Sequence, residues 1–334
     1  DSDLIFESVA EDLEIKKAIT KQIGEHAKEG TIIATGTSGL SIEELAKVLP
    51  SNLQSNYTGM HFFNPPYSMP LLELIPSSKM SKELIDDLKQ YLNDILLRCV
   101  IVCKDRPAFV ANRIGFQFLN KALQYAEKLA KQGGIAYIDS ILGPFTGRAM
   151  TPCITIDFVG LDVHKAIVDN IRINAKDNHE KDFVLPHYVE RLISEGKLGR
   201  KTGCGLFKTE INEDGKKLKF FYDISSDKYS LINDMTTEFS KTMISYLSNG
   251  DYELAIDYLK SDKSNEAKIC REFLDLYVKY SLFVGKEVCD DLTYIDDAMA
   301  TGFNWCPPLA LSNLLYGTNY PTKYDYRSFF KAVK

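Results

Sequence analysis

The sequence predicts an α/β domain at its N-terminal end and all-α structure after it. Short apolar runs alternate with amphipathic helical segments over residues 1–104, which is typical of α/β domains. Residues 105–208 show helical periodicity, and a short pattern from that part returns about 157 residues later. We therefore expect three domains, at residues 1–104, 105–208 and 209–334, the last containing a linker and a degenerate second helical copy.

The first domain should alternate strands and helices. Four short apolar runs are the expected strands: residues 4–8, 31–34, 57–63 and 100–103. Helices are expected over 12–28 and 81–97. The inward-facing residues of the first helix should be Leu13, Ile15, Ile19 and Ile23. Ser41 is a predicted helix N-cap, because Glu44 three residues later can complete a capping box. Asp-Arg-Pro at 105–107 breaks the pattern and ends the domain.

The remaining two domains should be mostly helical. Residues 109–131 have a long helical period, and 154–168 are apolar enough for a core or a subunit contact. Residues 209–230 are polar and contain a hairpin-type Asp-Gly turn at 214–215. Helices should then follow from about residue 231.

A degenerate repeat connects the two helical domains. Tyr-Ile-Asp at 294–296 echoes the same residues at 137–139, and Pro-Leu-Ala-Leu-Ser-Asn at 308–313 echoes Pro-Cys-Ile-Thr-Ile-Asp at 152–157. Both copies precede a glycine within a few residues. The pattern predicts a second helical copy, although two unrelated helix starts can also resemble each other by chance.

Composition excludes several classes of protein. With 45% apolar and 26% charged residues, the chain is neither disordered nor a membrane span, since no apolar run approaches about 20 residues. A net charge of −6 argues against a nucleic-acid surface. The seven cysteines are odd in number and scattered, so we expect reduced thiols in a cytoplasmic protein and no metal site.

The stretch most informative about function is Gly-Met-His-Phe-Phe-Asn-Pro-Pro at 59–66. The apolar run indicates a buried strand that Asn-Pro-Pro ends, so His61 should project from a strand end into a cleft. Glu73 follows in the apolar run 69–75, where a lone carboxylate needs a partner. A buried glutamate beside a histidine fixes its tautomer and makes it a base. The alternative is a satisfied core histidine and an unrelated surface glutamate.

The run His-Phe-Phe-Asn-Pro at 61–65 resembles the catalytic signature of the 3-hydroxyacyl-CoA dehydrogenase family. Four further stretches resemble motifs of the same family in the same order: residues 5–16, 35–41, 105–114 and 199–207. Gly-Pro-Phe-Thr-Gly-Arg at 143–148 is most similar to the bacterial multifunctional β-oxidation proteins. The resemblance implies the C-terminal portion of a Rossmann-type domain, followed by two repeated helical domains of the family's C-terminal type.

The resemblance also implies a reaction, the NAD-dependent oxidation of (S)-3-hydroxyacyl-CoA to 3-oxoacyl-CoA in fatty-acid β-oxidation. It makes His61 the general base and Glu73 its orienting partner, with Ser38 and Asn112 as hydrogen-bond donors to the substrate. The implied partners are the acyl-CoA substrate and either a second copy of the chain or an enoyl-CoA hydratase domain.

The same resemblance assigns five residues to the cofactor NAD: Glu11, Lys16, Ser38, Asn64 and Lys201. Three of them have simpler explanations. Lys16 can be a solvated helix lysine, Lys201 a loop charge and Ser38 a turn former.

Several features depart from the family pattern. Gly36 stands where the family has an asparagine, Ala108 where it has a glycine, and 149–152 differ from its Pro-Met-Gly-Pro. The Gly-x-Gly-x-x-Gly turn that binds the cofactor's pyrophosphate does not occur in these 334 residues. We therefore expect this chain alone to bind NAD weakly, to lack measurable dehydrogenase activity and to self-associate.

Two other functions stay open at this point. One is a β-hydroxyacid dehydrogenase that uses a catalytic lysine, against which the intact His61 motif argues. The other is a non-catalytic relative kept for stability or assembly, which the missing pyrophosphate turn would suit.

Overall fold

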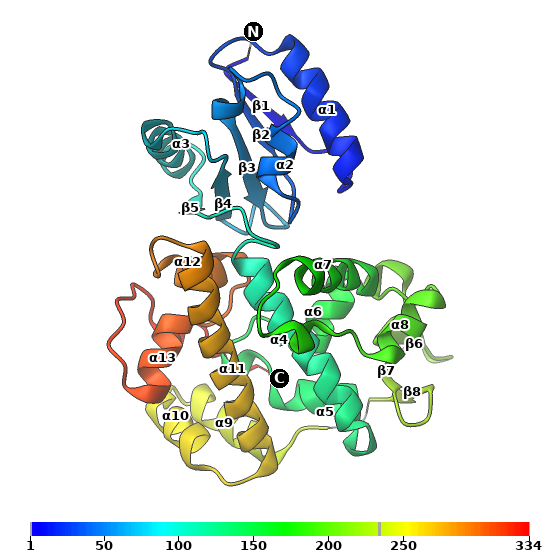
Figure 1. The fold of residues 1–334 in the computed structure, drawn as a ribbon. Helices are drawn as coiled ribbons and strands as arrows, with labels where there is room; N and C mark the ends of the chain where they lie inside the picture. The colour runs from blue at the N-terminus through cyan, green and yellow to red at the C-terminus, as the bar shows by residue number, and fades with distance from the viewer. Residues whose placement is uncertain (1, 233–234, 334) are drawn as a thin grey trace. The chain divides into compact units, whose positions relative to one another are not determined.

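The computed structural model describes residues 2–232 and 235–333, and the chain folds into two compact units (Figure 1). Unit 1 comprises Asp1–Arg113 and Ser281–Phe303, and unit 2 comprises Ile114–Tyr280 and Asn304–Lys334. Segment 281–303, expected within the third domain, therefore folds with the N-terminal part. The predicted domain boundaries at residues 104 and 208 stay a prediction.

Unit 1 is built on a five-stranded sheet. Its strands are β1 (Leu4–Glu7), β2 (Ile32–Thr35), β3 (Tyr57–Phe62), β4 (Leu71–Pro76) and β5 (Cys99–Val102), in the spatial order β1-β2-β3-β4-β5. The first three are parallel, β4 is antiparallel to β3, and β5 is parallel to β4. The four predicted strands are confirmed. The run that contains Glu73 adds β4 between two of them.

Helices cover both faces of this sheet. They are α1 (Leu13–His26), α2 (Ile42–Ala46), α3 (Lys82–Asp94) and α12 (Tyr294–Gly302), with a short 3₁₀ turn η1 at Gln54–Asn56. Figure 1 shows α1 and α2 on one side of the strands and α3 on the other. The α3 face encloses an apolar core made of Ala34, Met60, Leu72, Leu74, Met80, Leu88, Leu92 and Val100. On the opposite face, Gly59 lies under Ile42 of α2, and α12 packs on β4 and β5.

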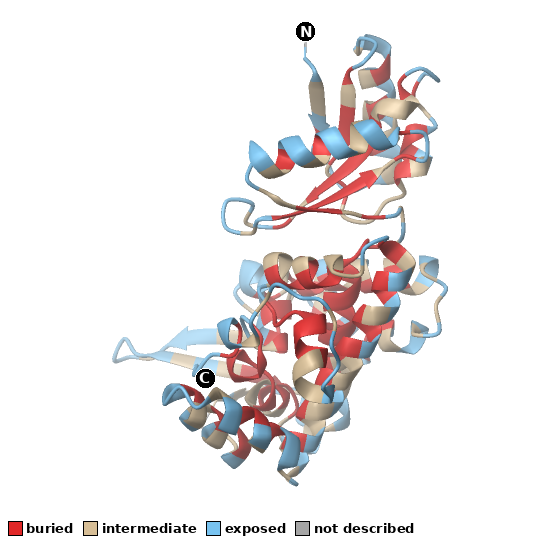
Figure 2. Ribbon diagram, turned by 90° about the vertical axis from the view of Figure 1, so that its left-hand side faces the viewer, coloured by how far each residue is buried: buried red, intermediate tan, exposed pale blue. Residues whose placement is uncertain are grey.

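The inner face of α1 differs from the prediction. The buried residues are Lys16, Thr20 and Gly24, spaced four apart, while Ile15 is 46% exposed. The expectation for Ile15 was therefore wrong. In Figure 2, which views the molecule from the α3 side, the outward stripe of α3 is exposed and the strands behind it are buried. Apolarity alone misled for α1 because a lysine with buried partners can occupy an inward position.

The Ser41 N-cap is confirmed, because its hydroxyl accepts a hydrogen bond from the Glu44 amide. The Glu44 carboxylate pairs with Lys47 instead of completing a capping box.

Unit 2 is mainly helical. Its helices are α4 (Ala111–Lys128), α5 (Gly134–Ile141), α6 (Pro152–Val159), α7 (Leu161–Asn174), α8 (His187–Ser194), α9 (Glu238–Ser248), α10 (Tyr252–Ser261), α11 (Asn265–Val288) and α13 (Pro308–Tyr316). Short 3₁₀ turns η2 (Ala130–Gln132), η3 (Pro144–Thr146), η4 (Glu180–Phe183) and η5 (Arg200–Thr202) lie between them, and η6 (Tyr326–Ser328) follows α13.

The polar segment 209–230 forms most of a small antiparallel sheet of β6 (Phe207–Ile211), β7 (Lys217–Asp223) and β8 (Lys228–Leu231). The predicted turn at 214–215 lies in its first hairpin, where Gly215 has a positive φ of 76°. The next helix begins only at Glu238, later than expected.

Both members of the predicted repeat form helices. Pro152 and Pro308 each begin one, and the sixth residue of each helix ties down the chain that follows. Asp157 Oδ1 accepts from the amides of Leu206 (2.7 Å) and Phe207 (3.3 Å). Asn313 Oδ1 accepts from the Tyr320 amide at 2.8 Å. The two helices share a start and a polar sixth residue, and the duplication itself stays a prediction.

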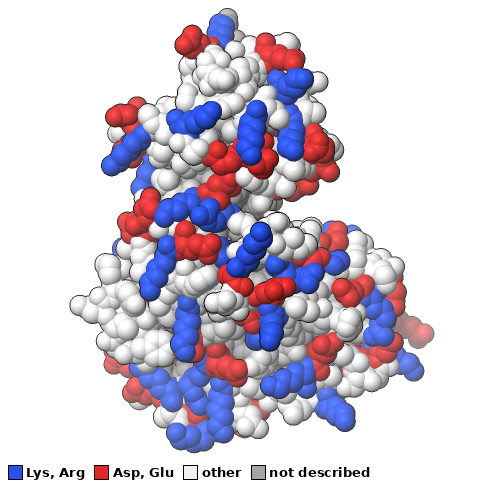
Figure 3. Space-filling view, viewed as in Figure 1, with Lys and Arg blue, Asp and Glu red and all other residues white. Residues whose placement is uncertain are grey.

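Within the described residues, no helix is long and apolar enough to cross a membrane. On the face shown in Figure 3, acidic and basic side chains are interspersed.

Candidate active site

His61 and Glu73 face each other on the antiparallel pair β3–β4. The strand register places the two residues directly opposite, and His61 Nδ1 lies 2.6 Å from Glu73 Oε2. His61 is 4% exposed and Glu73 is fully buried. Cross-strand partners have Cβ atoms about 5 Å apart, which suits direct contact between an imidazole and a carboxylate. The predicted pair is therefore in hydrogen-bond contact.

The second oxygen of Glu73 is held by the backbone. Glu73 Oε1 accepts hydrogen bonds from the amides of Val110 (3.0 Å) and Ala111 (2.9 Å) at the start of α4. A helix N-terminus carries unpaired amides and a partial positive charge, so it favours a carboxylate. Three donors thus converge on Glu73 although no Lys or Arg side chain binds it within the described contacts.

An unusual turn delivers those two amides. Ala108 and Phe109 both have left-handed backbone, with φ of 57° and 51°. A left-handed conformation, which glycine adopts most readily, is therefore used here by alanine. Left-handed backbone costs a residue with a Cβ about 1–2 kcal/mol. The turn stores strain where it positions Glu73.

Aromatic rings wall the imidazole. The Phe63 ring centroid lies 4.5 Å from that of His61, and the Phe109 centroid lies 5.7 Å away. Both phenylalanines are buried. An ionised carboxylate has only acceptors, so in its contact with a neutral imidazole Nδ1 carries the proton and Nε2 is left as an acceptor. The walled ring can therefore take a proton at Nε2 while Nδ1 stays anchored.

Three of the predicted residues gather where parallel strands β1 to β3 end. Glu11 follows β1, Ser38 follows β2 and Asn64 follows β3, and ligands of such sheets bind at this carboxyl edge. Glu11 Oε1 accepts from Thr37 Oγ1 at 2.6 Å and from the Ser38 amide at 2.8 Å. Glu11 thereby fixes the turn that carries Ser38, whose hydroxyl does not take part in that bond.

Asn112 lies in the first turn of α4 and is 8% exposed. It directly follows Ala111. Asn112 therefore follows in sequence a residue whose amide binds Glu73.

Lys16 is engaged in a buried ion pair. Its Nζ lies 2.9 Å from Glu7 Oε1 and 3.6 Å from Glu11 Oε2, and the side chain is 1% exposed. Glu7 also accepts from Thr35 Oγ1 and from the Val9 amide, each at 2.6 Å. Burial raises the pKa of Glu7, but hydrogen bonds from Thr35, Lys16 and Val9 outweigh it and leave the pKa below its ordinary value.

Lys201 belongs to unit 2, where its Nζ pairs with Asp162 at 2.5 Å. The side chain is 44% exposed, so this lysine pairs with a carboxylate on its own unit. The structure thus places four predicted cofactor residues in unit 1 and one in unit 2.

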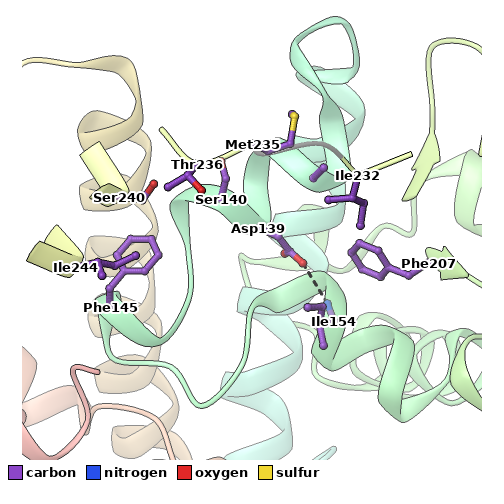
Figure 4. Close-up of a pocket in the computed structure, with 11 residues that line it drawn as sticks. Asp139, Ser140, Phe145, Ile154, Phe207, Ile232, Met235, Thr236, Ser240 and Ile244 are labelled. Atoms are coloured by element: carbon purple, nitrogen blue, oxygen red, sulfur yellow. Dashed lines mark hydrogen bonds between the residues drawn. The ribbon is translucent and has the colours of Figure 1, made fainter. Parts of the chain in front are cut away.

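An apolar cavity of about 260 Å³ in unit 2 contains none of the predicted site residues (Figure 4). Asp139 is its charged lining residue, and its carboxylate caps α6 by accepting from Thr151, Cys153 and Ile154. Burial raises the pKa of Asp139 to about 6, although these hydrogen bonds act in the opposite direction. The carboxylate is committed to holding a helix start.

Sequence reasoning missed three contributors to the site. The Val110 and Ala111 amides were missed because backbone donors leave no side-chain signature. Glu7 was missed as the partner of Lys16, although an acidic residue at a strand end facing a helix lysine was a usable signal. No group of histidines, cysteines and carboxylates within the described residues could hold a metal ion.

Comparisons with known proteins match both parts of the chain. Residues 1–106 match the profile described as 3-hydroxyacyl-CoA dehydrogenase, NAD binding domain, and residues 109–209 match 3-hydroxyacyl-CoA dehydrogenase, C-terminal domain. A Bacillus subtilis protein named "Probable 3-hydroxyacyl-CoA dehydrogenase" is 30% identical over 307 residues, covering 91% of this chain and 38% of that protein. This chain therefore spans less than half of that relative.

Two further comparisons extend the match. A Caenorhabditis elegans protein of the same name is 33% identical over 207 residues, covering 62% of this chain and 67% of that one. The crystal structure of 3-hydroxybutyryl-CoA dehydrogenase from Escherichia coli aligns with a TM-score of 0.67 at 20% identity, covering 94% of this chain and 75% of that one. At that identity it supports the fold alone.

Proposed function

Because this chain belongs to the 3-hydroxyacyl-CoA dehydrogenase family, we propose that it carries the proton-transfer site for NAD-dependent oxidation of (S)-3-hydroxyacyl-CoA to 3-oxoacyl-CoA. The observation that supports this most is the 2.6 Å contact between His61 Nδ1 and Glu73. An oxidation of this kind needs a base for the hydroxyl proton, and a buried, oriented imidazole with one free acceptor nitrogen meets that need.

In the proposed mechanism, His61 Nε2 accepts the proton of the substrate's 3-hydroxyl group. Glu73 holds the ring in one tautomer and faces the positive charge that the imidazolium then carries. Its own position is fixed by the amides of Val110 and Ala111. Phe63 and Phe109 limit water around the ring. Ser38 and Asn112 are the proposed hydrogen-bond donors to the substrate oxygens.

When bound, NAD supplies the acceptor for the hydride that leaves C3 of the substrate. The exposed residues Glu11 and Asn64 and the half-buried Ser38, together at the carboxyl edge of β1 to β3, fit the nicotinamide side of such a cofactor. Lys16 fits less well as a direct contact, because Glu7 already uses its ammonium group. Its proposed role is to hold Glu11 through the 3.6 Å contact. Lys201 remains a proposed cofactor contact.

The proposed pathway is fatty-acid β-oxidation, since residues 143–148 resemble multifunctional β-oxidation proteins. The proposed partners are the acyl-CoA substrate and either a second copy of the chain or an enoyl-CoA hydratase domain. Scattered cysteines support a reducing compartment such as the cytoplasm.

A non-catalytic relative is the second candidate, favoured by the commitment of Lys16 to Glu7. Turnover separates the two candidates. In the natural protein that contains these 334 residues, His61→Ala should lower kcat at least about 100-fold, the usual span for losing a general base. NADH formation from 3-hydroxybutyryl-CoA measures it.

His187→Ala is a matched control for this experiment. His187 also pairs with a glutamate, Glu190, at 3.3 Å, but its side chain is 96% exposed. Its removal should leave kcat unchanged. Near wild-type turnover in His61→Ala would remove His61 from the mechanism, and a wild-type protein without turnover would favour the non-catalytic relative.

A further inference from the structure

Cys103 and Cys289 come from distant parts of the sequence and lie opposite each other in unit 1. Cys103 directly follows β5 and Cys289 directly follows α11, and the two form an isolated antiparallel bridge. Both are free thiols, with exposed fractions of 2% and 6%.

The hydrogen bonds around the bridge define its type. The Lys104 amide donates to the Val288 carbonyl at 2.9 Å, whereas the amides of Cys103 and Cys289 donate elsewhere, to Leu74 and Gly285. The two cysteines are therefore a non-hydrogen-bonded antiparallel pair, for which opposed Cα atoms are about 4.5 Å apart. A disulfide accepts Cα separations of about 4.4–6.8 Å. Antiparallel pairing of this type therefore falls within the range of Cα separations that a disulfide accepts.

The two thiols also contact each other. Burial raises the pKa of the Cys103 thiol well above its ordinary value, and so do its hydrogen bond with Cys289 and the nearby Glu73 carboxylate. Because the thiolate is the reactive form, buried Cys103 should react slowly. Slow reaction suits a pair that stays reduced until conditions become oxidising.

An open cavity of about 640 Å³ lies against Cys103 of this pair. Cys103 and Val288 line it, and Lys104, Arg106 and Asp290 are among its charged lining residues. A cavity of this size holds a small molecule, so a small disulfide oxidant has a route to Cys103.

We propose that Cys103 and Cys289 form a reversible disulfide that staples the C-terminal end of α11 to the sheet of unit 1. In the first step, one cysteine thiolate attacks a small disulfide such as oxidised glutathione, forming a mixed disulfide and releasing one glutathione thiolate. The second cysteine then displaces the other glutathione. The two cysteines lose two electrons and two protons in total, and the oxidant becomes two thiols.

The disulfide would cross-link a part of unit 1 in which ion pairs lie next to the two cysteines. Arg113 pairs with Glu287 at 2.8 Å and Lys104 with Asp290 at 2.8 Å, next to the two cysteines. The disulfide would close a loop of 289 − 103 = 186 residues, and long loops gain stability when cross-linked because the unfolded chain loses entropy. Oxidation should therefore stabilise unit 1.

Oxidised glutathione applied to the folded protein, followed by peptide mass mapping, tests this proposal. We expect a Cys103–Cys289 cross-linked peptide, and an unfolding midpoint higher by roughly 2–8 °C that returns on adding a thiol reductant. Cys103→Ser and Cys289→Ser should each abolish the shift, so either one suffices if the other does not fold. Cys99→Ser, at the other end of β5, is the matched control and should keep it.

Three results would overturn the proposal. The first is that Cys103 and Cys289 both remain open to alkylation after oxidation and unfolding. The second is that either one cross-links to another cysteine instead. The third is a Cys103–Cys289 disulfide that leaves the unfolding midpoint unchanged.

Discussion

Two buried acid–base pairs lie on the sheet of unit 1, and they are built differently. In the pair Glu7–Lys16, the carboxylate is surrounded by donors from the protein: Glu7 accepts from Lys16, from Thr35 and from the Val9 amide. In the pair His61–Glu73, the carboxylate has three donors while the imidazole keeps one nitrogen free of that pair. We call the first pair closed, because protein groups engage both its carboxylate and its ammonium group. The second pair retains one acceptor, the imidazole nitrogen Nε2.

This difference indicates which of the two pairs can take part in proton transfer. A buried charge whose hydrogen bonds are satisfied stabilises the surrounding fold, and removing its partner is costly. An imidazole held at one nitrogen can gain a proton at the other without losing its anchor. Burial alone therefore did not distinguish the two pairs, whereas the count of donors and acceptors does.

The largest expected effect concerns the closed pair. Lys16→Met should lower the free energy of unfolding by about 3–5 kcal/mol, because Glu7 is left buried without its cation. Urea unfolding measures the loss. Adding Glu7→Gln to this variant should recover part of it. A Lys16→Met protein as stable as wild type would show that the pair carries no structural role.

The pH dependence of stability sharpens the comparison. The pKa of Glu7 is lowered in the folded state, so its contribution is present above the pKa of the unfolded chain, about 4.3. That contribution is lost as the pH falls through the folded-state value. Wild type should exceed Glu7→Gln by about 1–3 kcal/mol at neutral pH, with the gap closing in acid. A gap that stays constant between neutral and acidic pH would contradict this assignment.

A smaller effect is expected at the turn that delivers two amides to Glu73 of the His61–Glu73 pair. Ala108→Gly should raise the free energy of unfolding by about 1 kcal/mol, since glycine adopts the left-handed backbone without a Cβ penalty. Chemical denaturation measures the gain, with Ala111→Gly in the adjoining helix as a destabilising control. If Ala108→Gly destabilises the protein instead, the turn is not strained.

The sequence predicted the contact between His61 and Glu73 better than the surroundings of that pair. A histidine and a glutamate twelve residues apart meet because β3 and β4 form an antiparallel pair, and both apolar runs were visible. The amides of Val110 and Ala111 could not be predicted, since their position depends on the left-handed turn at Ala108. Ile15 was misplaced because Lys16 takes the inner position. The chemistry of the side chains could be read from the sequence, whereas the positions of the backbone donors depend on the fold.

A double-mutant cycle on turnover tests most directly whether His61 and Glu73 act as one unit. In the natural protein containing this chain, Glu73→Gln alone should lower kcat about 10- to 100-fold, because a neutral amide stabilises the imidazolium less than a carboxylate. Once His61 is replaced by alanine, Glu73→Gln should cost almost nothing further, since residues that act together are non-additive. If the two losses multiply instead, Glu73 acts independently of His61 and the proposed pair is contradicted.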